Sequence, residues 1–167
     1  MFRDRLIYVL KHSRILQTMY KVLVSLLFRF IGLFLKIDDK LVLFNSFAGK
    51  KYNDSPKVLF ELMKEDPYFM EYTFVWAFEH PEQFEIEGAQ CIKIDTWTYF
   101  KTALKSKLWI TSVNIERGLS FKKNDTIYIN TWHGAGTKKI GNACAGRNDY
   151  DISCVDMLLV QSSFEKD

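Results

Sequence analysis

The sequence predicts an α/β fold built on a parallel sheet, and three observations support this. Apolar runs of strand length recur at 41–47, 71–78, 90–94, 108–113 and 156–162, with one more that starts at residue 126 and ends near His133. The run at 71–78 is apolar almost throughout, as in strands that are covered on both faces. Helix-type patterns alternate with them, which is typical of βαβ units with right-handed crossovers.

Size and composition indicate one globular domain. The chain has 167 residues, of which 48% are hydrophobic and 26% are charged. Its three cysteines show no Cys-x-x-Cys spacing, so the sequence predicts neither a disulfide framework nor a zinc site, and it favours a reducing cytosol. We expect no nucleic-acid partner, because the positive charge is confined to one end: residues 1–37 hold seven basic residues against Asp4, and the remainder carries −3.

Residues 1–37 are expected to form a basic amphipathic helical segment. One stripe of its helical surface is polar, and the wide arc opposite is apolar. The stripe comprises Arg14, Thr18, Lys21, Ser25, Arg29, Gly32 and Lys36. This pattern predicts a helix that lies in the plane of an anionic membrane, with Arg14, Lys21, Arg29 and Lys36 as membrane contacts.

Two alternatives remain for this segment, and a signal peptide is disfavoured. The helix packs on the protein's own core or on a partner, or it spans the membrane. A span is less favoured, because the apolar stretch from Val22 to Leu35 is short and Arg29 interrupts it. A signal peptide would need an apolar centre and a small-residue cleavage site, which the segment lacks.

The domain predicted at 38–167 begins with a strand, a loop and a helix. Residues 38–40 end the basic segment, and the strand at 41–47 follows. The turn at 48–53 carries Lys50 and Lys51, and Asp54 or Ser55 is predicted to cap the next helix. Further on, His80-Pro81 breaks the strand at 71–78, residues 96–105 form a helix, and 114–125 is a polar connection.

The stretch around His133 carries the strongest chemical signal. The histidine ends a strand, and in parallel sheets ligands bind at that edge. An imidazole can accept a proton from a hydroxyl near neutral pH, so His133 is a candidate general base. Gly134 and Gly136 permit close approach of the backbone to a ligand, and the Thr137-Lys138-Lys139 run adds a helix cap and positive charge suited to phosphate. The alternative is a structural histidine that is hydrogen-bonded within a loop.

Two motifs resemble those of the CDP-glycerol glycerophosphotransferases, the teichoic acid primases and polymerases. Trp132-His133-Gly134 and the run at 137–141 are similar to the pattern Trp-His-Gly-Thr-Pro-Leu-Lys-Lys-Ile-Gly, although Ala135-Gly136 stands where that pattern has Thr-Pro. The family's first motif, Ser-Phe-x-Gly-Lys-x-Tyr-x-Asp/Asn-x-Pro, is matched by Ser46, Phe47, Gly49, Lys50, Tyr52, Asp54 and Pro56.

The resemblance implies a Rossmann-like N-terminal domain of a GT-B glycosyltransferase. Residues 38–167 would be the acceptor-side half, inactive without a C-terminal donor-binding domain. The implied reaction transfers glycerol phosphate from CDP-glycerol to a lipid-linked acceptor at the cytoplasmic membrane face, with His133 taking the acceptor proton and CMP released. No cofactor and no metal are predicted. The implied phosphate-binding or acceptor-binding residues are Gly134, Gly136, Thr137, Lys138, Lys139, Ser46, Gly49 and Lys50.

Two other functions remain open at this point. One is a transferase that uses another nucleotide-activated polyol or sugar. The other is a non-catalytic, membrane-bound module that binds a phosphorylated polymer or a partner subunit. The choice between primase and polymerase also stays open.

Overall fold

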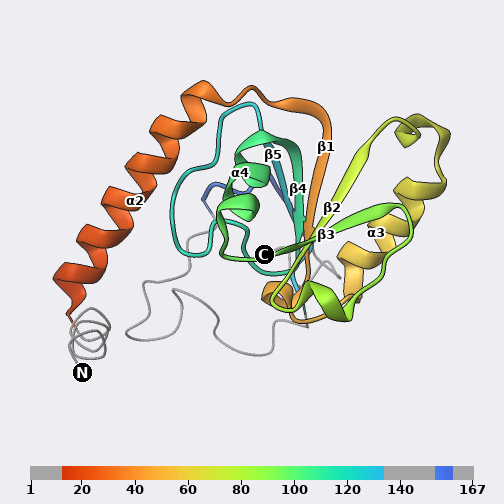
Figure 1. Ribbon diagram of the computed structural model, residues 1–167, viewed down its shortest axis with the longest axis horizontal. Coiled ribbons are helices and arrows are strands. Elements are labelled where there is room, and N and C mark those ends of the chain that lie inside the picture. The colour runs from red at the N-terminus through yellow and green to blue at the C-terminus, as the bar shows by residue number, and fades with distance from the viewer. Residues whose placement is uncertain (1–12, 134–152, 160–167) are drawn as a thin grey trace.

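The computed structural model describes residues 13–133 and 153–159, and a parallel β-sheet forms its centre (Figure 1). Within these residues the sheet has six strands in the order β3-β2-β1-β4-β5-β6, and each neighbouring pair is parallel. The predicted α/β fold with a parallel sheet is therefore confirmed. The strands are β1 (Asp38–Asn45), β2 (Thr73–Phe78), β3 (Ala89–Lys93), β4 (Ser106–Thr111), β5 (Ile127–Asn130) and β6 (Met157–Leu158).

The strand order places a topological switch between β1 and β4. The chain starts at β1 in the middle of the sheet, moves outward through β2 to β3, and then returns to the other side of β1 as β4. In such a sheet, the loops that follow β1 and β4 diverge at the carboxyl edge and leave room for a ligand between them. The loops after β1, β4 and β5 are thus neighbours.

Two helices cover opposite faces of the sheet. Figure 1 shows α4 (Trp97–Lys105) on one side and α3 (Asp54–Glu65) on the other. Phe60 of α3 packs into an aromatic core with Phe44 and Trp76, and Leu104 of α4 lies in the core of the opposite face. β1, β2 and β4 are covered on both faces along the stretches 41–44, 74–78 and 108–110, and these stretches are apolar throughout.

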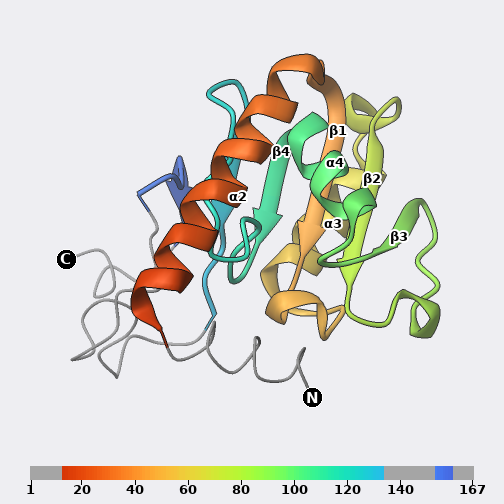
Figure 2. The same cartoon turned by 60° about the vertical axis from the view of Figure 1, so that its left-hand side comes forward.

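The long helix α2 (Arg14–Phe34) rests on the α4 side of the sheet (Figure 2). Phe28 stacks on Phe100 of α4, with ring centroids 4.5 Å apart, and Ser25 accepts a hydrogen bond from Ser120 N–H. Gly32 lets the helix approach the domain closely, because a Cβ there would lie 3.2 Å from a methyl carbon of Leu104. The docked side therefore includes the small polar members of the predicted stripe.

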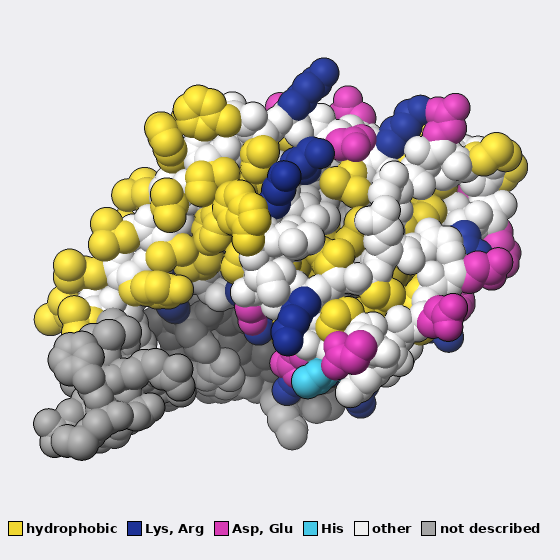
Figure 3. All heavy atoms as spheres, viewed as in Figure 1, with side chains coloured by type: hydrophobic (Ala, Val, Ile, Leu, Met, Phe, Trp, Pro, Cys, Tyr) yellow, Lys and Arg dark blue, Asp and Glu magenta, His cyan; other side chains and the backbone are white. Residues whose placement is uncertain are grey.

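The apolar arc of α2 is turned away from the protein. Figure 3 shows hydrophobic side chains projecting along this helix, and the most exposed are Ile15, Leu33 and Phe34, at 74%, 79% and 74%. The stretch Ile15–Phe34 has the length and apolar content of a membrane span, with a mean hydropathy of 1.4, and 11% of it is buried. Among the described residues, α2 thus packs on the domain through Phe28 and its neighbours and leaves most of its apolar side chains exposed.

Several element boundaries differ from the sequence prediction. β1 begins at Asp38, which was expected to end the helical segment, because Asp38 pairs with Ser106 of β4. β1 also ends at Asn45, two residues before the chain turns into the left-handed region at Phe47. α3 begins after Asn53, so the prediction of Asp54 or Ser55 as its N-cap is wrong. The Asn53 side chain accepts a hydrogen bond from Ser46 Oγ instead of bonding to the helix.

The connection between β4 and β5 is organised by a buried carboxylate. Glu116 is 3% exposed, and its Oε1 accepts hydrogen bonds from the backbone N–H groups of Phe121 and Lys122. Lys122 also pairs with Asp156 at 3.0 Å, and Lys123 donates to the Leu35 carbonyl at the end of α2. Lys122 and Lys123 therefore join this connection to its neighbours.

Candidate functional site at the carboxyl edge

His133 lies just beyond β5, in contact with two aromatic rings. Its half-buried ring stacks on Trp132, with centroids 5.3 Å apart and an angle of 8°, and contacts Phe47 at 5.1 Å. Phe47 comes from the loop after β1, about eighty residues earlier in the chain. The two motifs that were identified in the sequence therefore meet at this histidine.

Asn130 fixes the backbone that carries His133. Its side chain is buried at the end of β5, where Nδ2 donates to the Val113 carbonyl at 2.9 Å and Oδ1 accepts from Trp132 N–H at 2.8 Å. Trp132 adopts a left-handed φ of 55°, which is costly for a bulky residue. The Asn130 hydrogen bond supports this conformation and thereby directs the chain into the His133 position.

The loop after β1 reaches the histidine through three successive left-handed residues. Phe47, Ala48 and Gly49 have φ values of 46°, 56° and 87°. Ser112, which follows β4, accepts a hydrogen bond from Phe47 N–H at 3.2 Å. Gly49 is required at its position, because a Cβ there would lie 3.0 Å from Glu79 N. The loop is thus tied to the ends of β4 and β2.

The predicted binding residues of this loop take different positions. Ser46 is fully buried, and its hydroxyl donates to the Asn53 carbonyl at 3.1 Å, so it shapes the loop. Gly49 is also buried and accepts from Glu79 N–H through its carbonyl. Lys50 is exposed, and Lys51 places its amine 5.3 Å from the centroid of the Phe47 ring. The Lys51 ammonium group therefore contacts the same aromatic ring that contacts His133.

Other predicted site residues lie outside the described residues. These are Gly134, Gly136, Thr137, Lys138 and Lys139, together with the side chain of Arg14. Within the described residues, no group of three or more His, Cys, Asp and Glu side chains is placed to hold a metal ion.

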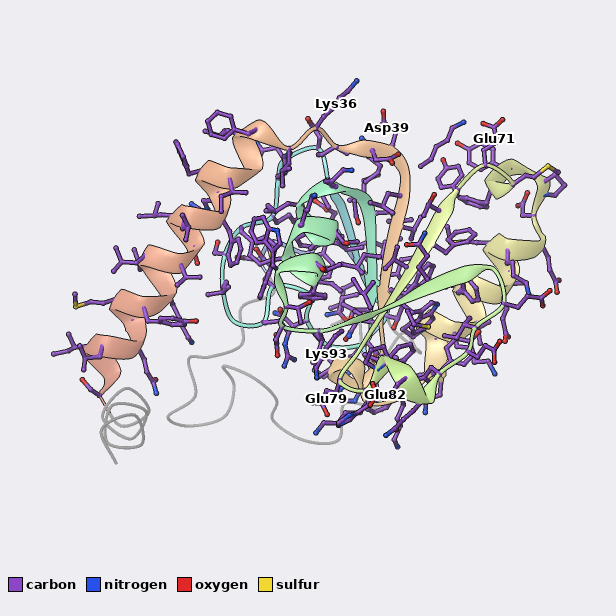
Figure 4. The ribbon with its side chains drawn as sticks, viewed as in Figure 1. Lys36, Asp39, Glu71, Glu79, Glu82 and Lys93 are labelled. Atoms are coloured by element: carbon purple, nitrogen blue, oxygen red, sulfur yellow. The ribbon has the colours of Figure 1, made fainter. Side chains whose placement is uncertain are left out.

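The basic residues of α2 do not form one exposed row. Arg29 donates to the carbonyl and the hydroxyl of Ser120, at 2.8 and 2.6 Å, and so points to the protein itself. Lys21 is half-buried beside Gly118, whereas Lys36 is exposed at the far end of the helix (Figure 4). Arg29 is thus bonded to the loop between β4 and β5 while remaining exposed, and its membrane contact stays a prediction.

Some ionisable groups around the carboxyl edge are engaged in pairs or have shifted pKa values. Arg117 forms a two-fold ion pair with Asp95 at 2.9 Å, and these hydrogen bonds raise the pKa of Arg117. Burial, assisted by the Glu61 carboxylate, raises the pKa of Tyr52 to about 12, which keeps this phenol protonated. His80 is exposed, and its Nδ1 lies 3.1 Å from Glu82. Unlike His80, His133 contacts residues with left-handed backbone, Phe47 and Trp132.

Sequence reasoning did not assign roles to the residues that hold the histidine. Phe47 and Trp132 were recognised only as motif members, and the contacts from Asn130 and Ser112 were not foreseen. Two signals were available: Asn130 is a polar residue at the end of an apolar strand, and Phe47 follows a strand directly before a glycine-containing turn.

Comparison with known proteins gives a consistent family assignment. Residues 27–166 match the family described as CDP-glycerol:poly(glycerophosphate) glycerophosphotransferase. The chain is 33% identical over 107 residues to a teichoic acid poly(glycerol phosphate) polymerase of Staphylococcus epidermidis, covering 64% of this chain and 14% of the relative. It is 30% identical over 146 residues to a teichoic acid glycerol-phosphate transferase of Staphylococcus aureus, covering 84% of this chain and 34% of the relative.

Solved structures agree with this assignment. The wall teichoic acid polymerase TagF superposes with a TM-score of 0.58 at 29% identity, over 76% of this chain and 28% of that chain. A histidine variant of TagF soaked with CDPG gives a TM-score of 0.57 at 29% identity, over 64% of this chain and 25% of that chain. The chain spans at most about a third of the length of these relatives. The resemblance predicted from the two motifs is confirmed.

Proposed function

This chain belongs to the CDP-glycerol:poly(glycerophosphate) glycerophosphotransferase family, and we propose that it forms the acceptor-side domain of such a transferase. The donor would be CDP-glycerol and the acceptor a lipid-linked polyol-phosphate chain. The observation that carries this proposal is the position of His133 at the carboxyl edge, where the loops after β1 and β5 meet on its ring. Ligands of parallel α/β sheets bind at that edge.

In this proposal His133 is the general base. The acceptor hydroxyl oxygen attacks the phosphorus that bears glycerol, its proton passes to the imidazole, and the bond to the CMP phosphate breaks so that CMP leaves. The contacts with Trp132 and Phe47 would restrict the motion of the ring and so help to position its nitrogen for the acceptor hydroxyl. Lys50 and Lys51 add positive charge that favours a phosphate nearby.

The base assignment is tested by substitution in the full-length protein. His133→Ala is expected to lower the turnover of CDP-glycerol by at least about 10²-fold while leaving the circular dichroism spectrum unchanged, because a positioned base contributes roughly 10²- to 10⁴-fold. The matched control is His80→Ala, since His80 is exposed at the same edge and pairs only with Glu82 among the described residues. Near-normal turnover by His133→Ala would reject the assignment.

We further propose that α2 attaches this domain to the cytoplasmic face of the cell membrane. Its polar side is docked on the domain through Ser25 and Arg29, so the exposed apolar arc is free to enter the interface between headgroups and acyl chains. Lys36 stands at the end of this arc, where an anionic headgroup can pair with it. Docking on one side would also fix the orientation of the domain relative to the bilayer.

Vesicle flotation distinguishes the two sides of α2. Replacing Leu23, Phe30 and Leu33 together by Gln should weaken binding to anionic vesicles on the order of 100-fold, because each loses apolar burial. Arg29→Gln should change binding less than about twofold if Ser120 holds that side chain. A membrane-facing arginine would instead cost about fivefold. Equal binding by the triple variant and the unmodified protein would refute the proposal.

A further inference from the structure

A groove separate from the histidine lies between α4 and the sheet. Its volume is about 420 Å³, and Leu41 and Val75 form its apolar floor. One side of α4 forms the wall, with Trp97, Lys101 and Lys105 among its members. The Trp97 side chain is 56% exposed, which is high for a residue of this size.

The wall residues follow a regular spacing along α4. Trp97, Lys101 and Lys105 are four residues apart, so they lie on one face of the helix with a rise of about 6 Å between them. Neither lysine forms an ion pair with a residue that the structure describes. In α3, by contrast, Lys57 has its partner Glu61 at the same spacing, 3.5 Å away. The two like charges on α4 repel each other, and an anion bound near both would reduce this repulsion.

Neutral polar groups complete the groove. Thr98 and Thr102 of α4 and Thr73 and Gln90 of the sheet also line it. Asp38 is the carboxylate among the lining residues, and its Oδ1 already accepts a hydrogen bond from Lys40 N–H at 3.0 Å. Two lysines against one aspartate leave a net positive charge. An aromatic surface, hydroxyls, an amide and spaced ammonium groups together suit a polyol that carries phosphates.

We propose that this groove binds the already polymerised part of a polyol-phosphate acceptor, at a distance from the reacting end. This inference rests on the proposed function. Successive phosphates in a glycerol phosphate chain are joined through six single bonds, which span roughly 7 Å when extended, as two residues of a polypeptide do. That spacing matches the rise between Lys101 and Lys105.

The direction of α4 supports a continuous path. The helix follows β3, so Trp97 lies toward the carboxyl edge and Lys105 toward the amino edge. The stripe therefore leads toward the edge at which His133 stands. α2 packs beside α4 through the Phe28–Phe100 stack (Figure 2). An acceptor whose lipid end is inserted next to α2 would pass along α4 before its free hydroxyl reaches His133.

Acceptor length provides the test in the full-length protein. Replacing Lys101 and Lys105 by Ala should raise KM about tenfold for acceptors of ten or more glycerol phosphate units, the order expected for two lost charge contacts. KM for an acceptor with one unit should not change, because that acceptor is too short to reach the groove. The matched control replaces Lys57 and Lys64 by Ala on α3, which removes the same charge from the opposite face of the sheet. Equal KM values for the variant and the unmodified protein on long acceptors, or equal losses on short and long acceptors, would overturn the proposal.

A binding measurement separates this inference from the proposed function. Titration calorimetry with soluble poly(glycerol phosphate), in the absence of CDP-glycerol, should show about tenfold weaker binding for the Lys101 and Lys105 double variant, and weaker binding at high salt. This result would support the groove even if His133→Ala retained full turnover. Unchanged affinity in the double variant would refute the groove even if His133 proved essential.

Discussion

The two edges of the sheet differ in the strain that their loops carry. Among residues 13–133 and 153–159, the non-glycine residues with positive φ lie in loops that leave the carboxyl edge or, for Asp54, at the first position of the helix that follows such a loop: Phe47, Ala48, Asp54, Asp95, Arg117 and Trp132. The described turns at the amino edge contain none. Exposed ion pairs lie at this edge instead, Lys40 with Glu71 and Lys107 with Asp39. Figure 4 shows Glu71 and Asp39 at the amino edge, and Glu79, Glu82 and Lys93 at the opposite edge.

This difference indicates that the carboxyl edge is shaped for something other than stability. Left-handed backbone at non-glycine residues costs of order 1–3 kcal/mol each and persists only where the surroundings enforce it. Here Ser112 holds Phe47, Asn130 holds Trp132, and Asp95 pairs with Arg117. Such strain gathers at functional sites, and in this protein two of the strained residues place their rings on His133.

The largest expected difference between the edges comes from two glycines that both have positive φ. Gly49→Ala should lower the free energy of unfolding by about 3 kcal/mol, because the new Cβ meets the backbone of Glu79 and Phe78. Gly88→Ala at the amino edge should cost only about 1–2 kcal/mol, since the Lys64 side chain can move aside. Urea unfolding of both variants measures this. Equal losses would remove the contrast between the edges.

A second comparison concerns buried polar side chains. Asn130→Ala should cost about 2 kcal/mol, because it leaves Trp132 N–H and the Val113 carbonyl without these partners. It should also reduce turnover in the full-length protein. Ser106→Ala at the amino edge removes one hydrogen bond to the Thr102 carbonyl and should cost about 1 kcal/mol with turnover unaffected. If Asn130→Ala kept normal turnover, its proposed support of His133 would be wrong.

Relief of strain gives a smaller effect of opposite sign. Ala48→Gly should raise the free energy of unfolding by about 0.5 kcal/mol, because the left-handed penalty of roughly 1–2 kcal/mol exceeds the added entropy of an unfolded glycine. Thermal unfolding checks this against Ala103→Gly, which lies inside α4 and should be destabilising. A destabilised Ala48→Gly variant would mean that the loop is not strained at this position.

The smallest expected effect is on stability at the amino edge, where the contribution of the Lys40–Glu71 ion pair depends on pH. The hydrogen bond and charge of Lys40 lower the pKa of Glu71, and Glu71 in turn raises the pKa of Lys40. The Glu71 contribution to stability is therefore present above its unfolded pKa of about 4.3 and is lost as pH falls through the lower folded value. The Lys40 contribution is lost as pH rises through its folded value. Urea midpoints for Glu71→Gln should lack the acid-side loss, and an unchanged pH profile would show that the pair contributes nothing.

Much of the fold could be predicted from the sequence, because apolar strands and intervening helices leave clear patterns. The orientation of α2 could not. Its polar stripe contains Ser25 and Gly32, whose small size permits close docking, and periodicity alone does not tell which side of an amphipathic helix meets the protein. The start of β1 was missed because pairing between Asp38 and Ser106 depends on tertiary contacts rather than on local sequence.

The site was predictable in part. The order and spacing of the two motifs pointed to His133 and to the loop after β1, and parallel topology explains why they meet. The left-handed conformations of Phe47 and Trp132 left no signal, since bulky residues rarely adopt them and neighbouring strands impose them. For the same reason the burial of Ser46, which the motif resemblance predicts to be a binding residue, could not be foreseen.

Chemical rescue tests the central claim most directly. In the full-length His133→Ala variant, the space between Phe47 and Trp132 should admit free imidazole, and added imidazole should restore transfer of glycerol phosphate from CDP-glycerol in proportion to its concentration. We predict low turnover without imidazole and recovery with it. Turnover close to that of the unmodified protein without any added base would contradict the claim that His133 accepts the proton.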